Sequence, residues 1–144
     1  MADTNYGYKY GERIPVVLPL DSSSTAILVN DPLTVATAGY YKKAASGDVV
    51  YAVAMQQVDT ADLPASDGLA SILADVSPLS VYRYPVKSGG TLVVGMRGKT
   101  CDFGGSQSID VTASTNDDTH IVAADTVNNA ALVRFLIPAI GGVV

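Results

Sequence analysis

Few side chains in this chain are of a type that does chemistry at neutral pH. His120 is the only histidine and Cys101 the only cysteine, so a zinc site within one chain would have to recruit carboxylates, an unusual ligand set. A Ser-His-Asp triad has its three residue types, but no serine lies in a Gly-x-Ser-x-Gly elbow. We therefore interpret His120 as a surface or interface side chain and Cys101 as a small buried residue.

Two short motifs suggest phosphate or metal chemistry, and both are incomplete. Gly98-Lys99-Thr100 matches the end of a phosphate-binding loop, but Val93 stands where that motif needs its first glycine, and no helix start follows. Asp102-Phe103-Gly104 spells the metal-binding tripeptide of protein kinases, but no His-Arg-Asp precedes it. The sequence therefore predicts no enzyme and no cofactor.

Aspartates are the remaining candidates for chemistry. They gather in one stretch and in one adjacent pair: Asp59, Asp62, Asp67 and Asp75, then Asp117-Asp118. Carboxylates could bind calcium, but no run matches an Asp-x-Asp-x-Asp-Gly loop, and turns and caps explain most of these residues. Two carboxylates could also hydrolyse a glycoside if the fold separated them correctly. The chain has no Trp to provide a sugar platform, and calcium binding by the Asp-rich stretch stays open.

The composition indicates which kind of fold must position these residues. Hydrophobic residues make up 48% of the chain and charged residues only 16%, against about 25% charged in a typical domain. Thirteen of the acidic residues are Asp and one is Glu, and there are thirteen Gly. Asp and Gly favour turns, whereas Glu favours helices. We expect an all-β fold, a small barrel or sandwich. The net charge of −5 disfavours binding to nucleic acid.

The first twenty residues differ from the rest of the chain. Tyr6, Tyr8 and Tyr10 alternate with other residues, which predicts three phenols on one side of an extended segment. An apolar run then contains Pro15 and Pro19, and proline cannot donate to a sheet ladder, so a central strand is excluded. We predict an extended arm over residues 1–20 that presents an interface to another subunit: Tyr6, Tyr8, Tyr10, Ile14, Val16, Val17 and Leu18. The alternative is that this segment covers its own domain.

Residues 21–144 are expected to form a single β domain. Strands are predicted over residues 25–29, 33–36, 79–85, 91–96, 101–103, 108–113 and 130–137. A hairpin is predicted over residues 40–54, with its turn at Gly47-Asp48. One short helix is predicted from apolar residues at helical spacing: Leu69, Ile72, Leu73 and Val76.

The chain shows no basic and apolar leader of the kind that directs secretion. Its longest apolar runs reach about seven residues, against roughly 20 needed to span a bilayer. We therefore expect synthesis in a cytoplasm and no association with a membrane.

Residues 33–59, LTVATAGYYKKAASGDVVYAVAMQQVD, resemble the capsid decoration (cement) proteins of tailed bacteriophages. Those proteins commonly carry a strand, a glycine followed by a hydrophobic strand, and then a Gly-Asp turn before a further strand. The strand VYRYPV at residues 81–86 and the terminal strand ending LVRF at residues 132–135 are also similar to that family. Ala52 stands where the family commonly has glycine.

The resemblance implies a small β protein, often a homotrimer, that binds the outside of an expanded phage head. It would brace contacts between subunits of the major capsid protein, and its location would be the outer surface of a virion assembled in a bacterial host. A second hypothesis is another virion module, a tail or head fibre that binds a receptor or a glycan. A third is a small β enzyme, which a loss of activity in His120→Ala would support.

Overall fold

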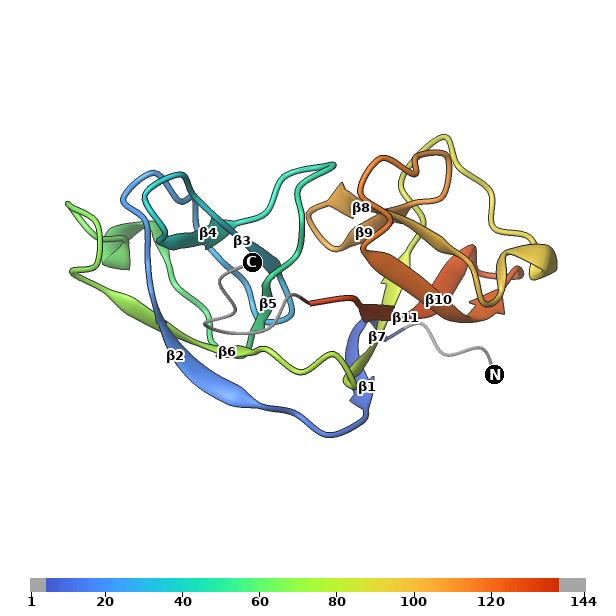
Figure 1. Cartoon of the computed structure of the whole chain (residues 1–144), viewed down its shortest axis with the longest axis horizontal. Coiled ribbons are helices and arrows are strands. Elements are labelled where there is room, and N and C mark those ends of the chain that lie inside the picture. Colours follow the sequence, from blue (N-terminus) through green and yellow to red (C-terminus); the bar gives the residue numbers. More distant parts are fainter. Residues whose placement is uncertain (1–4, 138–144) are drawn as a thin grey trace.

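The chain folds into two antiparallel sheets that lie next to each other (Figure 1). The computed structural model describes residues 5–137. The five-stranded sheet has the order β2 (Pro15–Pro19), β6 (Ser71–Asp75), β5 (Ala52–Ala54), β3 (Pro32–Val35), β4 (Tyr41–Lys43). The six-stranded sheet has the order β1 (Gly7–Tyr10), β7 (Val81–Pro85), β11 (Ala130–Phe135), β10 (Thr119–Asp125), β8 (Thr100–Gly105), β9 (Ser108–Asp110). Two single-turn 3-10 helices complete the described elements, η1 (Thr60–Asp62) and η2 (Val94–Met96).

Both sheets curl until an edge strand meets the end of a strand from the other side of the same sheet. In the five-stranded sheet a parallel bridge joins Leu20, just after β2, to Tyr41 of β4. In the six-stranded sheet a parallel bridge joins Val86, just after β7, to Ile109 of β9. One bridge is not a ladder, so neither sheet closes into a barrel. The predicted all-β class is confirmed, and the arrangement is sandwich-like.

Each curled sheet surrounds its own hydrophobic cluster. The cluster of the six-stranded sheet is rich in rings, with Tyr82, Tyr84, Phe103 and Phe135 fully buried. The cluster of the five-stranded sheet is aliphatic, and its largest members are Leu20, Ile27, Leu33 and Ile72. Burial alternates along β2, whereas four consecutive residues of β7 and of β8 are buried, so both faces of those two strands are covered.

The predicted helix is wrong. Residues 71–75 form β6, which pairs with β2 on one side and β5 on the other. Ile72 and Ala74 are fully buried and Val76 is 4% exposed, while Leu69 is 73% and Leu73 36% exposed. Burial therefore follows a period of two, and the apparent helical spacing arises because Ile72 and Val76 fit both patterns.

The predicted hairpin over residues 40–54 is wrong in its pairing. The turn at Gly47 is present, with φ at 82° and an Asp48 N–H bond to the Ala45 carbonyl. However, β4 and β5 do not pair with each other, because β3 lies between them and pairs with both. The strands predicted over residues 25–29 and 91–96 are also absent. The first contains only an isolated bridge at Ile27, and the second contains η2.

Buried aspartates fix the loops between these strands. Asp102 is 3% exposed and accepts hydrogen bonds from the backbone N–H groups of Thr115, Asn116 and Asp117 at 2.8–3.0 Å. Asp31, 1% exposed, accepts from the Leu28 N–H at 2.8 Å. A carboxylate with several N–H donors can remain buried without a counter-ion. These aspartates act as turn anchors, as aspartate commonly does.

Candidate functional site

The segment predicted as an arm is built into the fold as an edge strand of each sheet. β1 pairs with β7 at the edge of the six-stranded sheet, and β2 pairs with β6 at the edge of the five-stranded sheet. The segment therefore covers its own domain, which is the alternative left open by the sequence. Its site residues are positioned by the sheets and not by a separate arm.

Two connections run side by side where the chain passes between the sheets. One joins β1 to β2 and the other joins β6 to β7. A Cβ atom on Gly11 would lie 2.3 Å from the Leu79 carbonyl oxygen, and Gly11 has a φ of +104°. Only glycine satisfies both conditions. The Val76 N–H donates to the Ile14 carbonyl at 3.0 Å, which joins the two connections.

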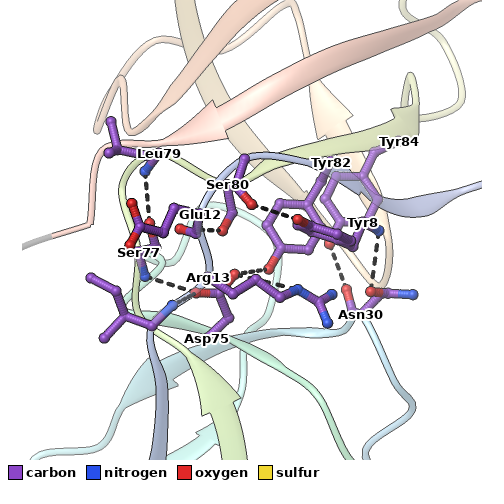
Figure 2. A network of polar contacts seen from close by, with 12 residues as sticks. Tyr8, Glu12, Arg13, Asn30, Asp75, Ser77, Leu79, Ser80, Tyr82 and Tyr84 are labelled. Carbon is purple, nitrogen blue, oxygen red and sulfur yellow. Dashed lines mark hydrogen bonds and ion pairs between the residues drawn. The ribbon is translucent and has the colours of Figure 1, made fainter.

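Asp75 is the centre of this junction (Figure 2). It lies at the end of β6, is 1% exposed, and accepts hydrogen bonds from the backbone N–H groups of Ile14 and Ser77 at 3.0 and 2.9 Å. The Tyr82 hydroxyl, from the other sheet, donates to the second carboxylate oxygen at 2.6 Å. The Arg13 guanidinium lies 3.8 Å from that same oxygen. Asp75 thus connects both sheets to the N-terminal segment.

Asn30 makes a second connection between the sheets (Figure 2). Its side-chain oxygen accepts from the Tyr8 N–H at 3.2 Å, and its carbonyl accepts from the Tyr84 hydroxyl at 2.5 Å. The Arg13 guanidinium stacks on the Tyr8 ring at 3.6 Å from the centroid, a close cation–π contact. Burial raises the pKa of Tyr82 and Tyr84 well above the usual range. Both phenols therefore stay protonated and act as donors.

Backbone hydrogen bonds show which residues of β2 face its partner. Ile14 accepts from the N–H of Val76, and Leu20 donates to the carbonyl of Ala70 at 2.9 Å. Along an antiparallel strand the hydrogen-bonding direction alternates. Even-numbered residues of this segment therefore face β6, and odd-numbered residues direct their backbone polar groups away from the sheet.

The outer edge of β2 is consequently poor in donors. Its outward residues are Pro15, Val17 and Pro19, and proline has no N–H. Val17 alone offers an N–H along this edge. Proline at an edge prevents another strand from adding to the sheet. A partner must contact this edge through side chains.

The predicted interface residues divide into exposed and buried groups. Tyr6, Tyr10, Ile14 and Val17 are 44%, 49%, 47% and 64% exposed. Tyr8 packs edge-on against Tyr82 with ring centroids 5.8 Å apart, Val16 packs against the aliphatic cluster, and Leu18 is 5% exposed. The three tyrosines do not share one face, because the pairing of β1 with β7 shifts register between Tyr8 and Tyr10.

Two exposed apolar residues next to this segment were missed by sequence reasoning. Leu73 lies directly opposite Val17 in the β2–β6 ladder, and Leu79 lies beside Gly11 and is 55% exposed. The false helical pattern placed Leu73 on a buried face. Correct alternation over residues 71–75 would have placed it outside. We call the six exposed residues the apolar strip: Tyr6, Tyr10, Ile14, Val17, Leu73 and Leu79.

A groove of about 580 Å³ lies between β4 with the residues that follow it and the turn that joins β8 to β9. Its lining combines hydroxyl groups, small residues and two lysines: Ser23, Thr25, Lys42, Lys43, Ala44, Ala45, Ser46, Gly104, Gly105, Ser106 and Ser108. It contains no aromatic platform for a sugar ring. Lys43 is held by Asp31 at 3.5 Å.

The residues with potential chemistry remain apart. Cys101 is 3% exposed, and burial raises the pKa of its thiol to about 12, so the nucleophilic thiolate is suppressed. His120 lies in β10 opposite Arg134. Within residues 5–137 no three His, Cys, Asp or Glu side chains form a group suited to a metal ion. In the same range no helix is long and apolar enough to cross a membrane.

No family model, curated protein or solved structure matches this chain.

Proposed function

We propose that this chain is a structural virion protein that binds the outside of an expanded tailed-phage capsid and stabilises contacts between subunits of the major capsid protein. The apolar strip is the observation that carries this proposal. Exposed tyrosine and aliphatic side chains on strands, and on the segments that flank them, lose little conformational entropy on binding, which favours a protein interface. The resemblance described for residues 33–59 supports the same role.

The junction around Asp75 supports this proposal by fixing the strip. Ile14 is held by its own N–H on Asp75 and by its carbonyl on Val76, and Val17 and Leu73 are held by the β2–β6 ladder. A preorganised surface keeps more of its contact energy as affinity. The prolines of β2 direct the partner to the side chains and prevent addition of a strand. Binding only to the assembled shell would stabilise that shell by mass action.

On this proposal the partners are the major capsid protein and neighbouring copies of the chain, which the resemblance implies form a homotrimer. Many weak contacts on one shell add through avidity. The protein would be made in the cytoplasm of a bacterial host and would reside on the outer surface of the capsid. The second role, a fibre or glycan-binding module, finds less support, since the groove has no aromatic lining.

Co-sedimentation with expanded capsids that lack the protein tests the proposal. We expect binding that saturates at a fixed copy number per shell. The variant Tyr10→Ala/Ile14→Ser/Val17→Ser removes exposed apolar groups and should weaken binding by at least about tenfold, since each lost contact costs on the order of 1 kcal/mol. Tyr8 is excluded from the variant because it packs in the core.

The matched control is Val127→Ser, at an apolar residue that is 88% exposed and lies outside the strip. It should bind like the wild type. Equal binding by the strip variant and the wild type would remove the strip as the contact surface. Failure of the wild type to bind any expanded shell would refute the capsid role itself.

A further inference from the structure

Charge is unevenly distributed over this acidic molecule. Four cations each lie within 4 Å of a carboxylate: Arg13 with Asp75 at 3.8 Å, Lys43 with Asp31 at 3.5 Å, Arg83 with Asp125 at 3.1 Å, and Lys87 with Asp110 at 3.9 Å. These pairs are neutralised locally. The cations beside η2 are different.

Arg97, Lys99, His120 and Arg134 form what we call the basic patch. Gly98 donates to the Ile121 carbonyl and Ile121 donates to the Lys99 carbonyl, both at 2.8 Å, so residues 97–99 lie beside 120–121. His120 is directly opposite Arg134 in the β10–β11 ladder. Directly opposite residues share a face, with Cβ atoms about 4.5–5.5 Å apart.

The basic patch has no counter-charge within residues 5–137. No carboxylate there lies within 4 Å of Arg97, Lys99 or Arg134, and the Arg134 Nε is buried without a hydrogen-bond partner. The nearby Asp118 faces inward, where it accepts from the Val50 N–H at 2.8 Å. Exposed apolar residues flank the patch, Val94 at 71% and Leu136 at 51%.

The loop over residues 59–67 has the opposite character, and we call it the acidic loop. Asp59, Asp62 and Asp67 are all exposed. Asp59 accepts from the Gln57 side chain and Asp67 from the Ser22 N–H, and no cation among the described residues lies within 4 Å of the three carboxylates. The loop ends beside Leu69, which is 73% exposed.

The two 3-10 helices next to these surfaces lie at opposite ends of the long axis. Figure 1 shows the green coil of η1, within the acidic loop, at one end and the gold coil of η2, beside the basic patch, at the other. We propose that copies of this chain associate head to tail, with the basic patch of one copy on the acidic loop of the next. Each side offers charges that the other lacks, together with an exposed apolar residue.

A second copy fits the basic patch better than a nucleic acid does. The net charge of −5 repels the extended phosphate backbone of a nucleic acid along its whole length. A second copy carries the same net charge, but its acidic loop concentrates three carboxylates on one small surface that can face Arg97, Lys99 and Arg134. The contact uses two different patches and is therefore heterologous, so successive copies form a ring or an open chain. The proposal stands on these surfaces alone and does not depend on the capsid role.

Sedimentation velocity of the full-length protein alone tests this contact. We expect reversible association at concentrations up to about 1 mM in about 20 mM NaCl, and a loss of association in about 500 mM NaCl, where charges are screened within a few ångströms. A wild type that stays monomeric at low salt throughout this range would overturn the proposal.

Charge exchange makes the test specific. Arg97→Glu/Lys99→Glu and Asp59→Lys/Asp62→Lys alter only exposed residues, and circular dichroism should confirm that both variants fold. Each alone should associate at least about tenfold more weakly than the wild type, because like charges meet. Mixed in equal amounts, the two variants should associate again, since each supplies the charge that the other now needs.

The control is Glu12→Lys/Lys42→Glu, which exchanges charges outside both surfaces at side chains that form no ion pair within residues 5–137, and it should associate like the wild type. Unchanged association of either single-patch variant, or no recovery in the mixture, would refute the pairing of these two surfaces. Because no capsid is present, the outcome is independent of the co-sedimentation experiment. A wild type that stays monomeric would also contradict the homotrimer that the resemblance implies, whereas capsid binding through the apolar strip would still be decided by co-sedimentation.

Discussion

The two halves of the molecule differ in what their cores are made of. The six-stranded half buries rings, and Tyr82 and Tyr84 stack with centroids 5.8 Å apart. The five-stranded half buries aliphatic side chains. Aromatic side chains with hydroxyl groups can be buried at one end and still donate at the other. The aromatic half therefore supplies donors to the contact between the halves, and the aliphatic half receives them on Asp75 and Asn30.

Hydrogen bonds elsewhere along this contact run in both directions. The five-stranded half donates the Gly47 N–H to the Phe103 carbonyl at 2.9 Å and the Val50 N–H to Asp118 at 2.8 Å, and the six-stranded half donates the others. Gln107 donates to Asp31 at 2.9 Å, Lys87 donates to Ser46 at 2.9 Å, and Asn116 donates to the Gly47 carbonyl. The two halves are thus joined by polar bonds as well as by apolar contacts, because Ala44, Val50 and Val53 of the five-stranded half belong to the aromatic cluster. Such bonds cost more when one partner is lost than they contribute when both are present. We therefore expect a substitution that removes one partner of a bond at this contact to destabilise the protein more than a substitution on the surface.

The largest expected effect comes from removing the N-terminal segment, which contributes a strand to both halves. Deletion of residues 2–20 takes an edge strand from each sheet, two donors to Asp75 and Asn30, and the buried Leu18 and Leu20. We expect a chain without cooperative thermal unfolding by circular dichroism. Deletion of residues 2–4 is the control, since it retains both strands. A native spectrum from the longer deletion would show that residues 21–144 fold alone.

Cavities in the two cores test whether the halves unfold together. Phe135→Ala should cost about 3–5 kcal/mol and Ile72→Val about 0.5–1.5 kcal/mol. Both residues are buried, in the aromatic and aliphatic clusters respectively. We expect one urea transition in each variant, with tyrosine fluorescence and far-ultraviolet circular dichroism coinciding. Two transitions in Phe135→Ala would show that the halves are independent units.

Tyr82→Phe removes one hydrogen bond between the halves and little volume. Asp75 would keep its N–H donors but lose the hydroxyl 2.6 Å away, and a buried carboxylate short of a donor costs about 1–3 kcal/mol. Chemical denaturation measures this change. Tyr6→Phe, at a ring that is 44% exposed, should change stability by less than about 0.5 kcal/mol. Equal stabilities would show that the Tyr82–Asp75 bond contributes little.

We expect the smallest change in stability from a substitution of Asp118, and it should be visible in how stability depends on pH. Burial raises the pKa of this carboxyl above the ordinary value of an aspartate. The folded protein therefore binds this proton more tightly than the unfolded chain does. The contribution of Asp118 to the free energy of unfolding is largest below the pKa of the unfolded chain, and it is lost as pH rises through the pKa of the folded protein. Asp118→Asn keeps an acceptor for the Val50 N–H and removes the buried charge.

The wild type and Asp118→Asn should therefore diverge as pH rises from about 4, with the variant equally or more stable at neutral pH. Denaturation midpoints at a series of pH values provide the comparison. Asp102→Asn is the contrasting variant, because both oxygens of Asp102 accept backbone N–H bonds and an amide nitrogen cannot accept. It should be destabilised at all these pH values. Parallel pH profiles for the wild type and Asp118→Asn would contradict the raised pKa.

Local features of the fold were predictable, and pairings were not. Gly47 predicts its turn because a φ of 82° is a conformation that glycine adopts readily. The strand partners of that turn depend on β3, which lies elsewhere in the sequence. The strand β10 has no predicted counterpart, because Ile121-Val122-Ala123-Ala124 is apolar throughout and shows no alternation. A register shift between Ile121 and Ala123 removes the alternation in the structure as well.

In the candidate site, too, local features were predictable from the sequence and distant contacts were not. Pro15 and Pro19 correctly exclude a central strand, because proline lacks the N–H that a ladder needs on both sides. Nothing local to residues 5–20 indicates Asp75 or Tyr82 as partners, since the Ile14–Asp75 bond spans 61 residues. The burial of Tyr8 follows from the same distant contacts. Exposure within the apolar strip was therefore accessible only from the fold.

The long separation between the N-terminal segment and its partners also determines the order of assembly. β1 and β2 leave the ribosome first, yet the strands that they join, β6 and β7, are synthesised only after the middle of the chain. Domains form while synthesis proceeds at about 5–20 residues per second. The N-terminal segment therefore waits for several seconds with Ile14, Val17 and Leu18 uncovered. During that interval Pro15 and Pro19 protect it, because they prevent the waiting segment from pairing with another nascent chain.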